Sequence, residues 1–357
     1  MSEKSIVVAG AGGNIGSHLT PHLARMPQIG RVTLIDREVY ERRNAANQDI
    51  VGRDVGKPKA LVQARRLVEI RPNLEVNAIH APLEMLPLGA WRADLILACL
   101  DSRAARQAVN ERAWRLGIPW ADSGVLGSEW LARVNVYAPA SDAPCLECAW
   151  SDEDYGLREQ EYPCRGGAVA PAPNGASSEL GALAAAMLAL ECRKILDGEL
   201  ERAATGRQAT FNARWHRFAV TSFRRNPRCR FDHATWRIEP LRCRTREMRI
   251  SDLLAMAGSI RVPGQRFIRR LVCPACKGEK QLFSLEGSLD EHRLRCGACR
   301  RLMAAPGFDT LECLDGSLPA DALSLTLDQA GLRYGDVLQA GDRFFEIARN
   351  GVMESEK

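Results

Sequence analysis

The sequence predicts a two-domain α/β protein, in which a doubly wound, mostly parallel sheet of Rossmann-like topology precedes a smaller, cysteine-rich domain. Short apolar strands alternate with helix-like segments through the first half of the chain. This alternation is typical of a parallel sheet covered by helices on both faces. Paired cysteines concentrate in the last third. We place the domains at residues 1–240 and 241–357.

The elements follow one another at the spacing that βα units require. Apolar runs bounded by turn residues predict strands at 6–9, 31–36, 74–80, 93–99, 119–123 and 130–137. Helical patterns cover 17–26, 58–70 and 104–116. Residues 179–196 are rich in Ala and Leu, which favours a long helix packed on the sheet. Residues 209–220 are expected to add one or two closing strands.

Composition describes an ordinary globular protein of 357 residues, with 46% hydrophobic and 26% charged residues and a net charge of +5. The arginines are scattered and form no dense run, so we expect no nucleic-acid binding. We see no signal peptide and no apolar run of the roughly 18 residues that span a bilayer. We therefore expect a cytoplasmic protein whose 12 cysteines are metal ligands, nucleophiles or core residues rather than disulfides.

A glycine-rich turn follows the first strand in "VVAGAGGNIGS". Backbone amides of such a turn, and the positive end of the next helix, favour phosphate. The pattern G-x-G-G-x-x-G departs from the dinucleotide pattern G-x-G-x-x-G: either one residue is inserted, or Ala11 fills the first glycine position. The predicted nucleotide-binding residues of this turn are Gly10, Gly12, Gly13, Asn14 and Gly16.

Asp36 ends the second strand, 20 residues after Gly16, where a carboxylate accepts hydrogen bonds from ribose hydroxyls. Lys59 opens a helix after "GKP", a suitable place for a charge on phosphates. Asp101 lies at the carboxyl end of the fourth strand, where a carboxylate beside phosphates implies Mg²⁺. The alternatives are a tight turn without ligand, and Asp101 as a helix N-cap.

These motifs resemble the ThiF/MoeB/HesA superfamily of ubiquitin-activating-like adenylyltransferases over residues 5–235. The matching stretches, in the family's order, are "GAGGNIGS", "LIDREVYERRNAANQ", "GKPKA", "CLDSRAAR", "PCLECAW" and the segment from "YPCRGGA" into the long helix. The resemblance implies an adenylation fold, usually a homodimer. It also implies a reaction, in which ATP and Mg²⁺ adenylate the C-terminal glycine of a small ubiquitin-like protein. The activated acyl group then passes to a thiol or sulfur donor.

The resemblance also assigns roles to residues. Asp36 would bind the ribose, Asn44 and Gln48 would lie along ATP, Lys59 would contact phosphates, and Asp101 would organise Mg²⁺. The catalytic arginine of the family's R-Q pair is Asn47 here, which brings no positive charge. The family's amino-terminal arm, with its arginine, is also not seen. Arg42, Arg43 or a partner protein would then supply the charge, or adenylation is slow or lost.

Three C-x-x-C pairs predict metal sites. Cys273, Cys276, Cys296 and Cys299 have the spacing of a structural zinc ribbon near 270–302, because 19 residues separate the two pairs. Cys145 and Cys148 need two further ligands, for which Cys229 and His233 are our choice and Cys243 is an alternative for His233. We expect the two Zn²⁺ sites to be structural.

Cys164 stands outside these pairs, beside Arg165. A neighbouring cation lowers a thiol pKa, and the resemblance suggests an acyl- or persulfide-accepting nucleophile. A half-buried loop thiol is the alternative. Cys99, Cys192 and Cys313 are expected to be core residues.

Two other functions remain open at this point. A dehydrogenase would use the same fold, but no nicotinamide pocket is recognisable. A catalytically weak scaffold that binds a ubiquitin-like protein or a conjugating partner would explain Asn47. The region after about residue 245 has no counterpart in short family members. We expect it to recruit a conjugating enzyme or a sulfur donor.

Overall fold

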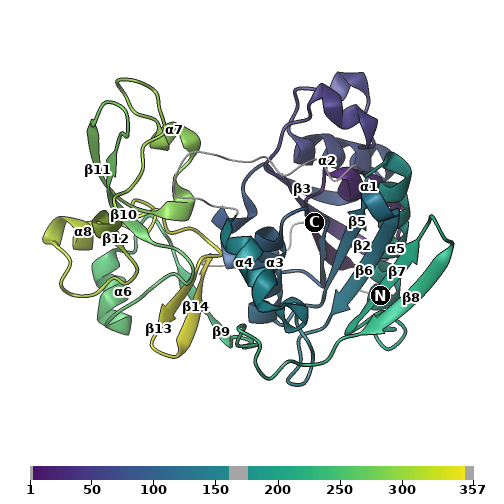
Figure 1. Cartoon of the computed structure of the whole chain (residues 1–357). Coiled ribbons are helices and arrows are strands. Elements are labelled where there is room, and N and C mark those ends of the chain that lie inside the picture. Colours follow the sequence, from purple (N-terminus) through teal and green to yellow (C-terminus); the bar gives the residue numbers. More distant parts are fainter. Residues whose placement is uncertain (1–2, 161–175, 350–357) are drawn as a thin grey trace. The chain divides into compact units, whose positions relative to one another are not determined.

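A computed structural model of the chain describes residues 3–160 and 176–349. These residues form two compact units, which are described separately (Figure 1). Unit 1 consists of residues 1–84 and 91–235, and unit 2 of residues 85–90 and 236–357. None of the helices in the described ranges is long and apolar enough to cross a membrane.

Unit 1 is built on one eight-stranded sheet in the order β3-β2-β1-β4-β5-β6-β7-β8 (Figure 1). The first five strands in this order are parallel, and the last three are antiparallel. The strands are β1 Lys4–Ala9, β2 Ile29–Ile35, β3 Glu75–Ile79, β4 Leu95–Ala98, β5 Trp120–Leu126, β6 Leu131–Tyr137, β7 Arg207–Asn212 and β8 Arg217–Ser222. The expected doubly wound, mostly parallel sheet is therefore confirmed.

Helices cover both faces of this sheet. α1 (Asn14–Ala24), α2 (Lys59–Ile70) and α5 (Ser178–Leu196) share a core with the buried residues of β1, β2 and β6. α3 (Arg103–Leu116) follows β4 and contacts both β4 and β5. A shorter helix, α4 (Asp152–Gln160), precedes the segment 161–175, which is outside the described residues.

Unit 2 has a separate apolar core and two three-stranded sheets. One sheet has the order β11-β10-β12, and the other β13-β14-β9. The strands are β9 Ile238–Cys243, β10 Phe267–Val272, β11 Glu279–Leu285, β12 Thr310–Leu311, β13 Val337–Ala340 and β14 Arg343–Arg349; the helices are α6 Ile250–Ala257, α7 Glu291–Leu294 and α8 Ala320–Ser324. Strands β9 and β14 pair in parallel although about 100 residues separate them.

One expectation about the core is wrong. Cys99 and Cys192 are buried as expected, but Cys313 is exposed. It follows the very short strand β12, and the apolar contacts of that region are made by its neighbour Leu314, which is fully buried. Single-sequence patterns do not distinguish which of two adjacent apolar residues faces the core in so short an element.

Candidate functional site

The glycine turn lies where β1 ends and α1 begins. Gly10 has a φ of 77°, and a side chain there would place its Cβ 2.5 Å from the carbonyl oxygen of Cys99. A Cβ on Gly12 or Gly16 would also collide with neighbouring atoms, whereas one on Gly13 would meet only ordinary contacts of 3.6 Å. The three sterically required glycines are therefore 10, 12 and 16, which favours the interpretation that one residue is inserted in the turn.

This turn lies at the topological switch point of the sheet. β1 pairs in parallel with both β2 and β4, and the chain order reverses between β1 and β4. Gly10, Asp36 and Asp101 follow the carboxyl ends of these three neighbouring strands. Ligands of open α/β sheets bind at this edge, so the topology brings together the residues that the sequence marks for a nucleotide.

Asp36 is 8% exposed and is held by two backbone donors. The amide of Gly12 donates to its Oδ2 and that of Glu38 to its Oδ1, each at 2.9 Å. Burial raises the pKa of the Asp36 carboxyl, which the two amides only partly offset. Each carboxylate oxygen keeps a second acceptor site, so ribose hydroxyls could still bind here.

Lys59 is buried and paired with Glu38, a contact that sequence reasoning missed. Its Nζ lies 2.7 Å from Oε2 of Glu38, and only 3% of the lysine side chain is exposed. Burial alone would raise the pKa of Glu38, but the hydrogen bond and charge of Lys59 hold it below the ordinary value. The signal was present in the sequence, because Asp36-Arg37-Glu38 occupies the family's D-x-D positions. An ammonium has three donors, so Lys59 can retain Glu38 and still reach a phosphate.

The loop between β2 and α2 carries Asn44, Asn47 and Gln48. Asn44 is engaged locally, because its Oδ1 accepts the amide of Glu41 at 2.8 Å. Nδ2 of Asn47 donates to the carbonyl of Ala176 at 3.3 Å. Oε1 of Gln48 is buried without a hydrogen-bond partner among the described residues.

Asn14 shows the same feature: its Oδ1 is buried without a partner in the described ranges, while Nδ2 donates to Ser177 at 3.1 Å. Buried polar atoms normally have partners. Two orphaned acceptors beside the turn therefore fit a ligand that supplies donors.

Two arginines of the same loop were expected to replace the arginine missing at position 47. Arg43 pairs with Glu41 at 2.7 Å, and Arg42 is exposed.

Asp101 is exposed and does not cap α3. The N-cap is Ser102, whose Oγ accepts the amide of Ala105 at 3.1 Å. Within the described ranges, the carboxylate of Asp101 has no hydrogen bond or ion pair. The N-cap interpretation of Asp101 is therefore wrong, and its carboxylate is free to take part in cation or nucleotide binding.

A buried ion cluster that the sequence did not reveal lies on β5, next to β4. Asp122 is fully buried and accepts from Nε of Arg106 at 2.8 Å and from Nη1 of Arg133 at 2.7 Å. Arg106 also donates to the carbonyl of Leu100. The cluster thus ties the segment that precedes Asp101 to the sheet.

The structure brings together the four residues expected to bind the first zinc. The ligand atoms of Cys145, Cys148, Cys229 and His233 lie within 4.8 Å of one another. Sγ of Cys145 is 3.9 Å from that of Cys148 and 3.7 Å from that of Cys229. Tetrahedral Zn–S bonds of about 2.3 Å require sulfur separations near 3.8 Å.

His233 is oriented for this site, because Nδ1 lies 2.7 Å from the carbonyl of Phe231 and Nε2 faces Sγ of Cys148 at 3.2 Å. A hydrogen bond from Cys145 lowers the pKa of the Cys148 thiol, which favours a thiolate. The alternative ligand Cys243 is not part of this group; it is buried on β9 in unit 2.

The second cysteine group, in unit 2, has the geometry of a zinc ribbon. The ligand atoms of Cys273, Cys276, Cys296 and Cys299 lie within 4.8 Å of one another. Backbone amides donate to Sγ of Cys273 and lower its pKa to about 6. The residues that follow the two pairs, Lys277 and Arg300, have φ of 60° and 61°, so each pair ends in the same left-handed turn. Both cysteine groups therefore fit Zn²⁺ by donor type and spacing.

The remaining predicted residue, Cys164, lies outside the described residues.

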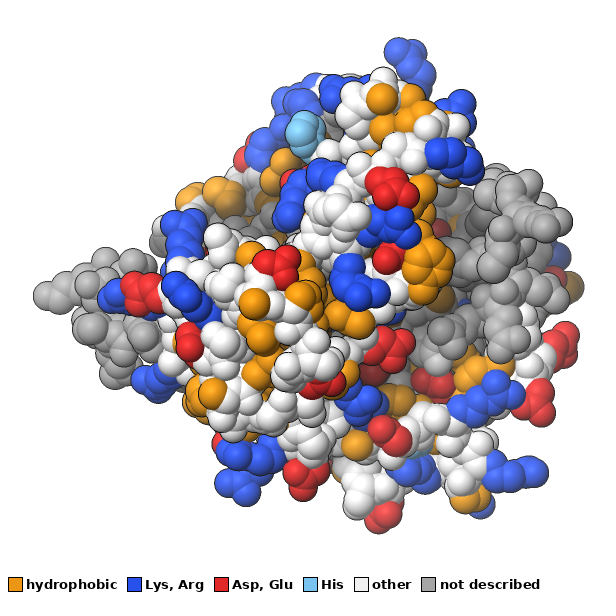
Figure 2. Space-filling model, turned by 90° about the vertical axis from the view of Figure 1, so that its left-hand side faces the viewer, with side chains coloured by type: hydrophobic (Ala, Val, Ile, Leu, Met, Phe, Trp, Pro, Cys, Tyr) orange, Lys and Arg blue, Asp and Glu red, His pale blue; other side chains and the backbone are white. Residues whose placement is uncertain are grey.

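On the face that Figure 2 shows, basic side chains are interspersed with acidic and apolar ones.

Comparison with known proteins identifies the family of the chain. The model of the ThiF family matches residues 1–231. The sulfur carrier protein ThiS adenylyltransferase of Escherichia coli is 28% identical over 189 residues, which are 52% of this chain and 72% of that protein. A sulfur carrier protein adenylyltransferase of Thermus thermophilus is 27% identical over 236 residues, 64% of this chain and 82% of that protein.

Among solved structures, E. coli MccB with ATP matches with a TM-score of 0.53 and 22% identity, over 64% of this chain and 65% of that chain. This likeness shows a common fold. The family match, in contrast, rests on sequence and spans well over half of the chain. The chain belongs to the ThiF family.

Proposed function

We propose that this protein is an ATP-dependent adenylyltransferase that activates the C-terminal glycine of a small ubiquitin-like protein. One observation carries the proposal: the carboxyl ends of β1, β2 and β4 bring the glycine turn, Asp36 and Asp101 to one edge of a ThiF-family sheet. The relatives named above are adenylyltransferases of sulfur carrier proteins, which supports this reaction class over an NAD-dependent oxidoreductase.

The residues have distinct tasks in this reaction. Turn amides and Lys59 would hold the phosphates, Asp36 the ribose, and Asn44 and Gln48 the nucleotide along the loop. Asp101 would hold Mg²⁺, which supplies charge neutralisation when bound. A glycine carboxylate oxygen attacks the α-phosphorus, the bond from that phosphorus to the bridging oxygen breaks, and pyrophosphate leaves with the electron pair.

Transfer of the activated acyl group forms the second part of the proposal. The Cys164 thiolate would attack the acyl carbon, forming a thioester and releasing AMP. A thioester that persists in Cys164→Ala would exclude this role. The adduct would be trapped with ATP and the ubiquitin-like protein, and identified by intact mass before and after a thiol reductant.

We also propose that the two cysteine groups bind structural Zn²⁺ and that unit 2 recruits a conjugating enzyme or sulfur donor. Both groups consist of four protein ligands, which leaves no open coordination position for a substrate. A cytoplasmic homodimer is the assembly that family analogy favours. Light scattering of the purified full chain tests the dimer.

The main test is ATP–pyrophosphate exchange with a candidate ubiquitin-like protein. Exchange should require the terminal glycine of that protein and should fall by about 10²-fold or more in Asp101→Asn. The matched control is Ser102→Ala, which removes the neighbouring helix cap and costs about 1 kcal/mol of stability but keeps the carboxylate. Equal exchange by Asp101→Asn and wild type would contradict the assigned role.

Asn47 favours a second candidate function, a scaffold that binds the ubiquitin-like protein with little adenylation. Its amide contacts a neutral carbonyl and places no charge near the phosphates. Tight binding of the ubiquitin-like protein without measurable exchange would identify this function.

A further inference from the structure

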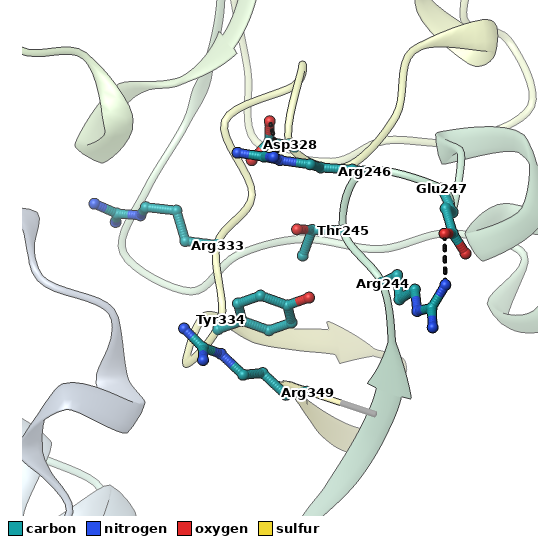
Figure 3. Close-up of a pocket in the computed structure, with 8 residues that line it drawn as sticks. All are labelled: Arg244, Thr245, Arg246, Glu247, Asp328, Arg333, Tyr334 and Arg349. Carbon is teal, nitrogen blue, oxygen red and sulfur yellow. Dashed lines mark hydrogen bonds and ion pairs between the residues drawn. The ribbon is translucent and has the colours of Figure 1, made fainter. Parts of the chain in front are cut away.

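Unit 2 contains a pocket of about 600 Å³ that none of the functions above uses (Figure 3). It lies beside the carboxyl ends of β9 and β14, and the turn that precedes β13 lines another side. Its lining residues are Arg244, Thr245, Arg246, Glu247, Asp328, Arg333, Tyr334 and Arg349. None of them belongs to the cysteine groups or to the glycine-turn site.

The pocket carries excess positive charge. Four arginines face the two lining carboxylates, and Asp336, whose Oδ1 lies 3.5 Å from Nη2 of Arg333, offsets a third arginine, which leaves one positive charge. Figure 3 shows the arginine side chains distributed around Thr245 and Tyr334, and they come from three separate segments of the chain. The guanidinium of Arg244 turns toward Glu247 and that of Arg333 turns away from Thr245 (Figure 3).

The carboxylates do not neutralise these arginines evenly. Arg244 is paired, with Nη1 2.9 Å from Oε1 of Glu247. Arg246 is 87% exposed in its side chain, and its Nε is 3.9 Å from Oδ2 of Asp328, the outer limit of an ion pair. Arg349 has no carboxylate partner in the described part of the chain. Arg246 and Arg349 are therefore the cations most available to a ligand.

The walls of the pocket are held in place without a ligand. Arg333 donates to the carbonyls of Gly287 at 2.9 Å and Met85 at 3.0 Å. The guanidinium of Arg349 lies over the ring of Tyr334, 5.3 Å from its centroid. The amide of Asp328 donates to the carbonyl of Thr245 at 2.9 Å, which joins two of the lining segments. Ordered side chains lose less entropy on binding than free ones.

We propose that this pocket binds a small polyanion with two or more phosphate or carboxylate groups. The guanidinium fork matches both groups with paired hydrogen bonds. Two anionic groups would pair with Arg246 and Arg349, and the volume lies in the range of small-molecule sites, about 300–1,000 Å³. This site is independent of adenylation.

Titration calorimetry of the full chain with two probes, inorganic pyrophosphate and citrate, tests the proposal. Pyrophosphate also fits the proposed ATP site. Only the binding that is lost when pocket residues are substituted is therefore assigned to the pocket. The test variant is Arg246→Gln/Arg349→Gln. Its control is Arg237→Gln/Arg242→Gln, which removes the same charge from exposed positions of unit 2 that do not line the pocket.

We expect the pocket variant to bind at least one probe about tenfold or more weakly, and the control within about twofold of wild type. Asp328→Asn should strengthen binding, because it frees Arg246 from its carboxylate. A loss for pyrophosphate alone assigns phosphate ligands, and a loss for citrate alone assigns carboxylates. Equal affinity of wild type and both double variants, or no binding of either probe to wild type, would overturn the proposal. If circular dichroism shows that the double variant does not fold, Arg246→Gln alone gives the same comparison.

Discussion

Asn47 occupies the position at which the family resemblance places an arginine. Substitutions of Asn47 therefore test whether the missing positive charge limits the rate of adenylation. Among the described residues, its side chain donates to the carbonyl of Ala176 at 3.3 Å. We predict that Asn47→Arg raises ATP–pyrophosphate exchange about tenfold or more, since one transition-state charge contact is worth at least that much. Asn47→Gln, which lengthens the side chain without adding charge, should leave the rate near wild type. An unchanged rate in the arginine variant would show that the charge comes from elsewhere.

Asp54 gives a pH-dependent prediction for the loop that precedes α2. Only 3% of its side chain is exposed, and it accepts the amide of Val51 at 3.1 Å and Nη2 of Arg65 at 2.6 Å. Burial alone would raise the pKa of Asp54, but these donors hold it below its ordinary value. A lowered folded-state pKa stabilises the fold above the unfolded pKa, near 4, and this contribution disappears as pH falls through the folded value.

We therefore expect Asp54→Asn to lower the free energy of unfolding by about 1–2 kcal/mol at pH 7, and by progressively less below about pH 4. Urea denaturation at pH 7, 5 and 3.5 measures this. The control is Asp152→Asn, because the Asp152 side chain is 96% exposed although it pairs with Arg230. A loss at pH 7 that persists in full at pH 3.5 would mean that the carboxylate charge is not its source.

At the scale of elements, the two cysteine groups predict the metal content of the chain. We expect elemental mass spectrometry to find two Zn²⁺ per full-length chain. It should find one Zn²⁺ in Cys229→Ser and one in Cys276→Ser, since serine is a poor zinc ligand. Cys313→Ser, at an exposed cysteine outside both groups, should keep two. Two zinc ions in Cys229→Ser would contradict the first site.

The elements around the nucleotide site were predictable because their signals are local. Residues 6–9 of β1 and all of β4 are continuous apolar runs that are buried, and α5 combines strong helix formers with a Ser177 cap. The glycine turn needs small residues for steric reasons that hold in any sequence. Asp36 and Asp101 then follow from the rule that ligands bind at strand ends.

The missed contacts depend on long-range packing instead. The Asp122 cluster joins residues on α3, β5 and β6, and the Lys59–Glu38 pair joins α2 to the end of β2. Neither pairing has a fixed sequence spacing. The helix cap is Ser102 rather than Asp101, the alternative that the sequence left open, and this difference of one residue is within the ordinary uncertainty of helix ends.

At the scale of the whole molecule, the chain enters unit 2 twice. Residues 85–90, from the connection between β3 and β4, belong to unit 2. The residues on either side of them in the sequence belong to unit 1. The amide of Gly89 donates to Gly335 at 2.8 Å, and the carbonyl of Met85 accepts from Arg333. Leu86 is buried. A boundary near residue 240, drawn from sequence composition, could not reveal this segment because its partners lie about 250 residues away.

This crossing predicts that unit 1 is weakened when unit 2 is removed. A fragment of residues 1–235 loses the contacts of 85–90 and exposes Leu86, so we expect its unfolding transition a few degrees below the corresponding transition of the full chain. About 1 kcal/mol corresponds to 2–4 °C for a domain of this size. Scanning calorimetry of both proteins measures this shift in transition temperature. Because Leu86 is exposed in the fragment, Leu86→Ser should reduce the aggregation of the fragment. Equal transition temperatures would show that the β3–β4 connection gains no stability from unit 2, and that the nucleotide-binding sheet folds independently of the segment.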